Sequence, residues 1–277
     1  MHGEVVTTQR LGSHLVRVVL GGPGLDEFVS TGDADEYVNC FFLPASATYS
    51  VPFEDELVRD LPRDQRPFAR RITVRSGDES RRELTHDIAV HGDIAAHGDI
   101  GYAGRWASNA SAGDRLQLRG PAGGYRPHPD ADSYLLVGDE SALPAIAACA
   151  ETVPAGRPVV AVIEVEDAAG EIELSSPGVL ETHWVHRASH PGDLDDLLAD
   201  TVRTLPRPAG TVSAFVHGEA ASTRAVRRVL LGERIVSEDR LSCSPYWRRG
   251  LDDEQWRAVK GDWTRAVAAE TFPAAHA

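Results

Sequence analysis

The sequence has little of what secreted and membrane-spanning proteins need. It contains only three cysteines, Cys40, Cys149 and Cys243, an odd number at wide spacings that fits neither a disulfide framework nor a zinc motif. No apolar run is long enough to span a membrane, and the first ten residues, MHGEVVTTQR, lack the apolar stretch of a signal peptide. We therefore expect a cytoplasmic protein whose cysteines are reduced thiols in or near the core.

Basic residues are also scarce. Lysine and arginine together number 28 against 42 aspartates and glutamates, which gives a formal net charge of -14. This balance argues against nucleic acid as a partner, because binding to phosphates needs a basic face. Lys260 is the only lysine, so nearly every fixed cation is an arginine, whose planar fork suits phosphate and carboxylate. A general composition bias would produce the same preference.

The first half of the chain has the pattern of an antiparallel β-barrel. Short β-rich runs broken by turn residues occupy residues 5–22, 37–43, 70–75, 83–92 and 114–121. Residues 46–65 carry acids and prolines without a sustained period, which predicts a loop across the outside of the barrel. We place this domain at residues 1–128.

The second half, residues 129–277, alternates strands and helices. An apolar strand over 133–139 is followed by a helical stretch over 141–153 and another strand over 158–166. Similar runs at 182–187, 211–219 and 221–233 predict a Rossmann-like domain with a parallel sheet. Residues 251–270 are expected to form an amphipathic terminal helix, because its apolar residues follow a helical period, namely Leu251, Trp256, Val259, Trp263 and Val267.

Two segments of the first half could bind a diphosphate. Residues 70–75, RRITVR, alternate charged residues with apolar or hydroxyl residues, although an arginine-rich strand is more often a solvated face. Residues 101–107, GYAGRWA, form a glycine-punctuated turn that enters a short helix, where backbone amides can hold phosphate. An ordinary loop is the plainer interpretation of this turn.

The segment just before that turn contains a local duplication, HGDIAA followed by HGDIGY. It places two histidines and two aspartates close together in the sequence, and such side chains could ligate a metal. A duplication that lengthens a surface loop explains the pattern more simply, so we expect no metal site at His91, Asp93, His97 and Asp99.

Further candidate segments lie at strand ends of the second half. Residues 138–145, GDESALPA, join a strand to a helix with Ser141 placed as an N-cap. A hydrolase is excluded, because Leu143 stands where the Gly-x-Ser-x-Gly elbow requires its second glycine. Residues 217–220, HGEA, and 246–250, YWRRG, could be structural, but an aromatic pair followed by arginines also suits a flat cofactor or an anionic ligand.

Taken together, these segments resemble the siderophore-interacting protein family, the FAD-dependent ferric-siderophore reductases of the ferredoxin-reductase-like superfamily. The resemblance runs roughly from Val5 to Trp263. It rests on the strand over 70–73, the His-Gly stretch that ends at 104–107, and the segments at 138–146, 217–220 and 246–250, in that order. It implies that the barrel binds FAD and that the parallel domain binds NADH or NADPH.

The resemblance also implies site residues. Arg70 would lie near the FAD phosphates, Thr73 near the ring system, and backbone amides from Ala103 to Ala107 would bind the diphosphate. The expected cofactor-binding residues are Arg70, Ile72, Thr73, Val90, His91, Ala103, Gly104, Arg105, Trp106, Ala107, Asp139, Glu140, Ser141, Ala142, Tyr246 and Trp247. Candidates for a basic patch that receives the ferric chelate are Arg248, Arg249 and Lys260.

Two features depart from the family pattern, and both fall in the FAD region. Ile72 stands where the family usually has an aromatic residue that packs on the flavin ring, which predicts a weaker hold on that ring or a hold from its other face. The duplicated HGDI lengthens the loop before the diphosphate turn.

The implied activity is transfer of electrons from NAD(P)H through FAD to a ferric siderophore, with release of Fe(II). No catalytic acid, base or nucleophile is required, because the cofactor carries out the redox chemistry. Three alternatives remain open: a ferredoxin-dependent or general flavin reductase of the same fold, a siderophore- or flavin-binding protein without turnover, and a protein-interaction module.

Overall fold

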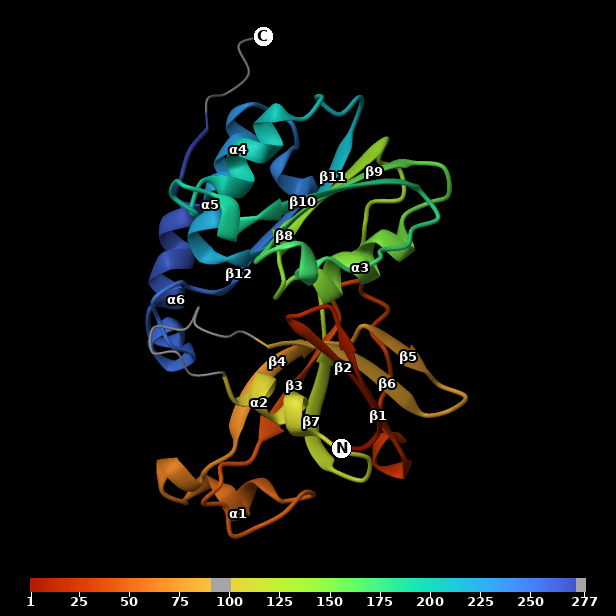
Figure 1. The fold of residues 1–277 in the computed structure, drawn as a ribbon, viewed down its shortest axis with the longest axis vertical. Coiled ribbons are helices and arrows are strands. Elements are labelled where there is room, and N and C mark those ends of the chain that lie inside the picture. Colours follow the sequence, from red (N-terminus) through yellow and green to blue (C-terminus); the bar gives the residue numbers. More distant parts are fainter. Residues whose placement is uncertain (91–100, 273–277) are drawn as a thin grey trace. The chain divides into compact units, whose positions relative to one another are not determined.

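The computed structural model describes residues 1–90 and 101–272. These residues form two compact units, the first ending at residue 126 and the second beginning at residue 127 (Figure 1). The duplicated HGDI segment, with His91, Asp93, His97 and Asp99, lies outside the described residues. No helix among the described residues is long and apolar enough to cross a membrane.

The first unit contains an antiparallel sheet of seven strands, which confirms the prediction from the short β-rich runs. The strands are β1 (His2–Leu11), β2 (Leu15–Gly21), β3 (Tyr37–Phe42), β4 (Phe68–Thr73), β5 (Ser76–Asp78), β6 (Glu83–Ala89) and β7 (Arg115–Ala122). They pair in the order β4-β3-β7-β1-β2-β6-β5. Buried and half-buried side chains alternate along β3, so one face of the sheet forms the core.

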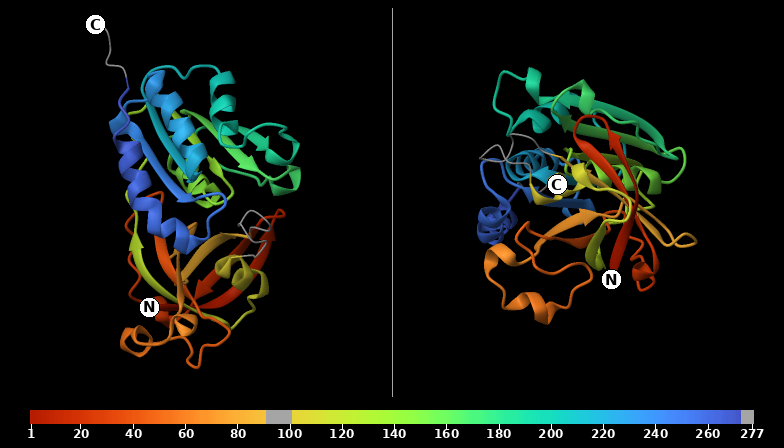
Figure 2. Two further views of the ribbon diagram at one scale, coloured as in Figure 1. Left: turned by 90° about the vertical axis from the view of Figure 1, so that its left-hand side faces the viewer. Right: turned by 60° about the horizontal axis from the view of Figure 1, so that its bottom comes forward.

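The sheet closes into a barrel. Strands β4 and β6 are far apart in the strand order, yet they contact each other. Helix α2 (Tyr102–Asn109) contacts β3 from one half of the order and β2 and β6 from the other half. Figure 2 shows the strands curving round on themselves. The enclosed core is aliphatic, and its members include Val18, Leu20, Val38, Cys40, Leu116 and Leu118.

A buried histidine completes the closure. His86 of β6 is 1% exposed, and its Nδ1 donates a hydrogen bond to the Thr73 carbonyl oxygen at 2.8 Å. Burial lowers the pKa of His86, so the ring is neutral at pH 7 with its proton on Nδ1. The backbone at the end of β4 is therefore tied to β6, although the two strands are not neighbours in the sheet.

The expected loop over residues 46–65 contains structure of its own. It includes a short helix α1 (Asp55–Arg59) and a 3-10 turn η2 (Arg63–Gln65). Gln117 of β7 fixes it by accepting a hydrogen bond from the Phe53 amide and donating one to the Phe53 carbonyl. The segment buries a small apolar cluster, with Val51, Phe53 and Val58 at its centre. The loop prediction was therefore incomplete, because these apolar residues follow no sustained period.

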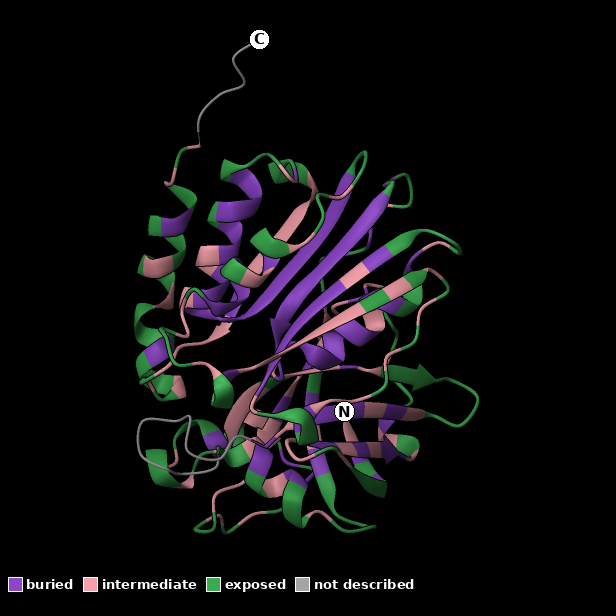
Figure 3. Ribbon diagram, turned by 45° about the horizontal axis from the view of Figure 1, so that its top comes forward, coloured by how far each residue is buried: buried purple, intermediate pink, exposed green. Residues whose placement is uncertain are grey.

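The second unit is built on a parallel sheet of five strands in the order β10-β9-β8-β11-β12, which confirms the predicted fold class. Its elements are β8 (Ser133–Asp139), α3 (Leu143–Thr152), β9 (Pro158–Val165), β10 (Val179–His186), α4 (Leu197–Thr204), β11 (Val212–Glu219), α5 (Ala220–Gly232), β12 (Leu241–Trp247) and α6 (Asp253–Ala268). Strands β8 and β11 are buried along their whole length, whereas the outer strand β10 is not (Figure 3). The remaining 3-10 turns of the chain are η1 (Pro23–Leu25), η3 (Ala168–Gly170), η4 (Arg187–Ser189) and η5 (Glu238–Arg240).

Helices cover both faces of this sheet. α4 and α5 pack against each other and share one apolar cluster with β8, β9 and β11. α3 contacts β8 and β9 but contributes nothing to that cluster, so it lies on the opposite face. Its sequence, LPAIAACAET, is apolar almost throughout because nearly all of it is buried.

The predicted terminal helix is present as α6. Asp252 and Gln255 form a capping box, in which each side chain accepts a hydrogen bond from the other residue's amide. Trp256 and Val267 are buried as expected, whereas Val259 is 44% exposed and does not belong to the apolar stripe.

In the second unit, one helix and one strand were not predicted from the sequence, and one cap was assigned wrongly. Helix α4 begins among aspartates, and β12 contains Pro245, which only an edge strand tolerates. Ser141 is not the N-cap of α3. Ala142 occupies that position, and the Ser141 hydroxyl donates to the Asp139 carboxylate instead.

The close approach of β8 and β11 makes glycine necessary at position 138. A Cβ there would lie 2.4 Å from the His217 carbonyl oxygen and 2.8 Å from the Ala142 Cβ. We expect Gly138→Ala to lower the free energy of unfolding of the second unit by about 1–3 kcal/mol. In α6, where the nearest atom to such a Cβ is the Arg265 Nη1 at 3.6 Å, Gly261→Ala should raise it by about 0.5–1 kcal/mol. Urea unfolding of both variants beside the wild type measures the two effects, and similar values for both variants would contradict the close approach.

Candidate functional site

Strand β4 presents the expected FAD residues on two different faces. Arg70 and Ile72 stand opposite Cys40 and Val38 of β3, whose side chains belong to the barrel core. Side chains directly opposite in a sheet share a face, so Arg70 and Ile72 lie on the core side of the wall. Thr73 comes next along the strand and faces the other way.

Next to Arg70, an aromatic stack joins β4 to helix α2. The rings of Phe68 and Tyr102 lie parallel, with centroids 3.6 Å apart and an interplanar angle of 13°. The guanidinium carbons of Arg70 and Arg105 lie 5.8 and 5.9 Å from the centre of the Tyr102 ring. Two cations therefore approach one aromatic ring at the start of α2.

The first turn of helix α2, which carries Tyr102, has amides without an acceptor inside the helix. It begins directly after Gly101, whose backbone is extended and which makes no side-chain cap. The amides of Tyr102, Ala103 and Gly104 precede the first intrahelical acceptor, since the first such bond runs from the Arg105 amide to the Gly101 carbonyl. These amides and the helix dipole favour an anion.

This arrangement corrects part of the predicted diphosphate turn. Residues 103–107 are helical rather than a turn, and the amide of Arg105 is already bonded within the helix. Trp106 packs against Phe42 at 5.6 Å between ring centroids, and Ala107 is buried in the core. Trp106 and Ala107 therefore anchor the helix, and Arg105 can meet a ligand only through its side chain.

The remaining expected residues of the first unit have structural contacts. The Thr73 carbonyl accepts the hydrogen bond from His86. The Thr73 hydroxyl is therefore the group of this residue that could contact a ligand. Val90 is buried, and its amide donates to the His14 carbonyl. Ile72 packs against the core cluster. His91 lies outside the described residues.

The donor set on this face fits the FAD that the sequence resemblance implies. Guanidinium groups and unbonded amides suit a diphosphate, and an apolar residue and aromatic rings beside them suit flat ring systems. All of these groups come from the first unit.

In the second unit, the Asp139 carboxylate connects three strand ends. Its Oδ1 accepts hydrogen bonds from the Ser141 amide, at 2.8 Å, and from the Ser141 hydroxyl. Its Oδ2 accepts from the Glu219 amide at 2.7 Å and from the Trp247 Nε1 at 2.8 Å. Asp139 ends β8, Glu219 ends β11 and Trp247 ends β12, so one carboxylate fixes the predicted site residues Ser141 and Trp247.

Glu140 is bound in a buried ion pair. It is 1% exposed, and both of its carboxylate oxygens accept hydrogen bonds from Arg187, at 2.6 and 2.7 Å. Arg187 also donates to Glu166 at 2.7 Å. Glu140 therefore holds the loops after β8, β9 and β10 together, and its expected contact with a cofactor receives no support from its position.

Glu164 is the one carboxylate of this cluster with an unused oxygen. It is 2% exposed, and its Oε2 has no hydrogen-bond partner among the described residues. Burial, and then the nearby Asp139 carboxylate, raise the pKa of Glu164 to about 8, although Arg187 and Arg249 oppose the shift. The side chain is consequently protonated at neutral pH.

The three cations of the predicted basic patch differ in their partners. Arg249 donates to Asp195 at 2.9 Å and lies 3.8 Å from Glu164. The Lys260 ammonium donates to the Pro245 carbonyl at 2.7 Å and so joins α6 to β12. Arg248 makes no side-chain hydrogen bond or ion pair with the described residues, although its charge is felt by Asp195. The three cations grouped in the prediction therefore differ in what their side chains contact.

His217 of β11 and Tyr246 of β12 form a small aromatic group on two neighbouring strands. The His217 ring stacks on Phe215 at 3.8 Å, and Tyr246 meets it edge-on at 5.1 Å. Its Nε2 bonds to the Ser242 hydroxyl at 2.9 Å. Burial, with a smaller contribution from Lys260, lowers the pKa of His217 to about 3. The imidazole is neutral in the folded protein.

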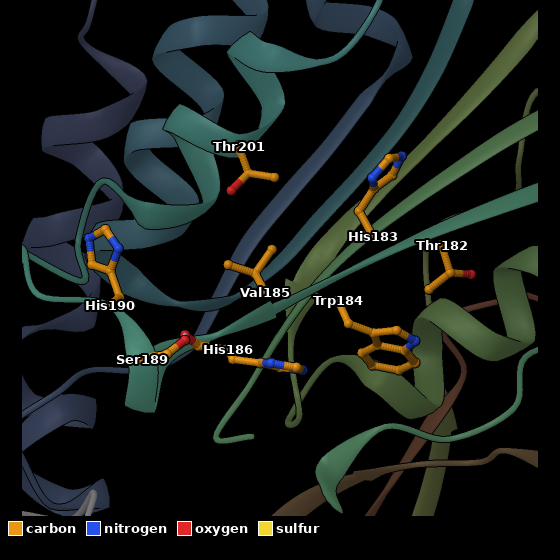
Figure 4. A pocket seen from close by; sticks show the side chains of 8 residues that line it. All are labelled: Thr182, His183, Trp184, Val185, His186, Ser189, His190 and Thr201. Atoms are coloured by element: carbon orange, nitrogen blue, oxygen red, sulfur yellow. The ribbon is translucent and has the colours of Figure 1, made fainter. Parts of the chain in front are cut away.

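An open hollow beside the edge strand β10 is rich in histidine, but its side chains do not converge (Figure 4). His183 points to the opposite side of the strand from Trp184 and His186. His183 pairs with Glu181 and His186 with Glu171. Among the described residues, no group of three or more potential ligands could hold a metal ion.

Two family models match the chain, one for each half. The model described as a siderophore-interacting FAD-binding domain matches residues 4–125, and the model described as a siderophore-interacting protein matches residues 131–250.

Named relatives and a solved structure agree with these matches. Ferric vibriobactin reductase ViuB of Vibrio cholerae is 31% identical over 255 residues, which is 91% of each chain. The NADPH-dependent ferric-chelate reductase of Escherichia coli is 30% identical over 246 residues, 88% of this chain and 91% of the other. The crystal structure of a siderophore utilization protein from T. fusca is 32% identical with a TM-score of 0.75, and the match covers 91% of this chain and 94% of the other.

Sequence reasoning missed several residues of the site. Phe68 lies just before the segment 70–75, and Tyr102 lies within the segment 101–107, but their stacking joins a strand to a helix that are distant in sequence. Arg187 is the last residue of a predicted run, 182–187, and only the fold shows that three buried or half-buried glutamates surround it. The short helix expected after the glycine turn is present, but it begins already at Tyr102.

The low pKa of His217 predicts how stability depends on pH. The unfolded state takes up a proton below the ordinary value of 6.5, whereas the folded state stays neutral down to about 3. Stability is therefore lost as pH falls below 6.5, by about 1.4 kcal/mol per pH unit from this residue. We expect the free energy of unfolding, measured by chemical unfolding between pH 7 and 5, to depend on pH less steeply in His217→Gln than in the wild type. The two slopes should differ by that amount. Equal slopes would mean that His217 takes up its proton in the folded state.

Proposed function

The chain belongs to the siderophore-interacting protein family, and we propose that it is a reductase that passes electrons from NADH or NADPH through FAD to a ferric siderophore. The observation that carries the proposal lies on the inner face of β4, where Arg70 approaches the ring of Tyr102, the first residue of α2, whose leading amides have no acceptor within the helix. The names of the two bacterial relatives, both ferric reductases, support the reaction class.

In the proposed complex, residues of the first unit hold the cofactor. Arg70 and the amides of Ala103 and Gly104 bind its diphosphate, and Ile72 lies against the flavin ring. FAD, when bound, supplies the exchange between a two-electron donor and a one-electron acceptor. The chain's own part is to bind and orient, so no acid, base or nucleophile is needed.

The proposed acceptor is ferric ion held by anionic oxygen ligands. Such ligands bind the hard ferric ion much better than the ferrous ion, so reduction releases iron and leaves the chelator intact. Of the cations proposed to receive the chelate, Arg248 remains the best candidate, because Arg249 and Lys260 have partners within the second unit. The protein's contribution to this step is a local positive potential on an acidic chain.

An anaerobic spectroscopic experiment tests the proposed reaction. We expect the purified protein to be yellow or to take up added FAD, and NADH or NADPH to bleach the flavin absorbance. Addition of a ferric siderophore should restore the absorbance, with a stoichiometric ferrous signal from a ferrous-specific chelator. A protein that binds the siderophore but never takes up FAD would instead be a binding protein without turnover.

The two arginines at the centre of β4 provide a matched pair for the cofactor site. Arg70 is on the inner face, whereas the Arg71 guanidinium lies 5.2 Å from the Tyr37 ring on the other face. We expect Arg70→Gln to raise the Kd for FAD by about 10- to 100-fold, because a bond between a cation and a phosphate is lost. Arg71→Gln should leave it within about twofold. Fluorescence titration with FAD measures both, and an equal loss in the two variants would show that the cofactor does not use the inner face.

A further inference from the structure

The aromatic stack at the start of α2 is only partly covered. Phe68 is half-buried, and Tyr102 remains 38% exposed while its ring lies 3.6 Å from the Phe68 ring. The Tyr102 side chain is carried by the first residue of α2, so it can turn about its own χ angles without disturbing the core. An exposed ring held parallel to another ring has the geometry of a stacking surface.

The charges around this stack favour a ring that carries phosphate. Arg70 and Arg105 approach the Tyr102 ring from two chain segments. The amides of Ala103 and Gly104 follow directly in the chain. A flat ring linked to a diphosphate satisfies the aromatic and the cationic groups together, whereas an apolar ligand would satisfy only the first.

The order of residues along β4 indicates which ring of FAD belongs here. Phe68, Arg70 and Ile72 share the inner face, and neighbours on one face of a strand are about 7 Å apart. Under the proposed function, the flavin ring lies at Ile72 and the diphosphate at Arg70. The diphosphate of FAD lies between its two ring systems. On the side of Arg70 away from Ile72, the next inner-face position is Phe68, which is therefore where the adenine would lie.

We infer that Phe68 and Tyr102 form the seat of the adenine ring of FAD, so that this ring is held by stacking while Arg70 and Arg105 hold the adjoining phosphates. This inference rests on the proposed function, because it takes FAD to be the cofactor. It also bears on the presence of Ile72. An isoleucine offers the flavin ring no aromatic partner, and a stacked adenine supplies affinity at the other end of the molecule.

The test compares FAD with FMN, which has the same flavin ring and one phosphate but no adenosine. Fluorescence titration of Tyr102→Leu should show about tenfold or greater weakening for FAD, because stacking of a base on an aromatic side chain is lost. The Kd for FMN should stay within about twofold, because FMN does not reach the seat. Tyr102→Phe keeps an aromatic ring and should bind FAD like the wild type, and Phe68→Leu should repeat the effect of Tyr102→Leu.

Tyr37→Leu is the matched control. Tyr37 also lies beside an arginine of β4, with the Arg71 guanidinium 5.2 Å from its ring, but on the other face of the strand. Its removal should leave the affinity for FAD within about twofold. Thermal unfolding of every variant checks that the barrel is intact, since neither tyrosine belongs to the buried core.

The outcomes separate this inference from the function on which it rests. Wild-type protein that binds neither FAD nor FMN would overturn both. Wild-type protein that binds FAD, with Tyr102→Leu binding it equally well, would overturn the adenine seat alone. Equal weakening for FAD and FMN would also overturn it, because the ring would then contact the flavin.

Discussion

The second unit depends on one buried carboxylate. Asp139 is 2% exposed and accepts four hydrogen bonds, which join the ends of β8, β11 and β12. A buried charge is tolerated only when its acceptor capacity is used, and here each carboxylate oxygen receives two donors. Gly218 is required for the same reason, since a Cβ at its position would lie 2.7 Å from the Asp139 Oδ2. The segments GDES, HGEA and YW are thus parts of one connection.

The same argument extends to the charges around Asp139. Glu140 and Arg187 form a buried pair that is costly to desolvate and stable only because its hydrogen bonds are complete. Glu164 lacks such completion, and it stays protonated instead. Glu219 uses one oxygen to cap α5 and the other to accept the Arg249 amide. The acids at these strand ends therefore bond to groups within the second unit and fix the positions of its loops. A cofactor or chelate would be affected by where these loops lie rather than by the charges of the acids.

The sequence predicted the architecture well because the architecture follows from periodicity. Alternating runs became the antiparallel barrel, and apolar strands alternating with helices became the parallel sheet. Prediction failed where a competing contact, or the place of a strand in the sheet, outweighed a local rule. Ser141 satisfies the rule for an N-cap, but its hydroxyl binds Asp139, and β12 forms despite Pro245 because an edge strand needs no second partner.

The candidate site, too, was predictable in part. Motif order predicted which segments matter, and the face on which each side chain lies followed from strand alternation once the pairing of β3 with β4 was known. The Phe68–Tyr102 stack and the pairing of Arg249 with Asp195 could not be predicted, because each joins residues that only the three-dimensional fold brings together. Arg249 and Lys260 have partners within the second unit, which leaves Arg248 there, and Arg70, Arg105 and the amides on β4 and α2, as the predicted anion-binding groups. A chain with a net charge of -14 can hold an anionic cofactor there, because the local field, rather than the total charge, decides binding.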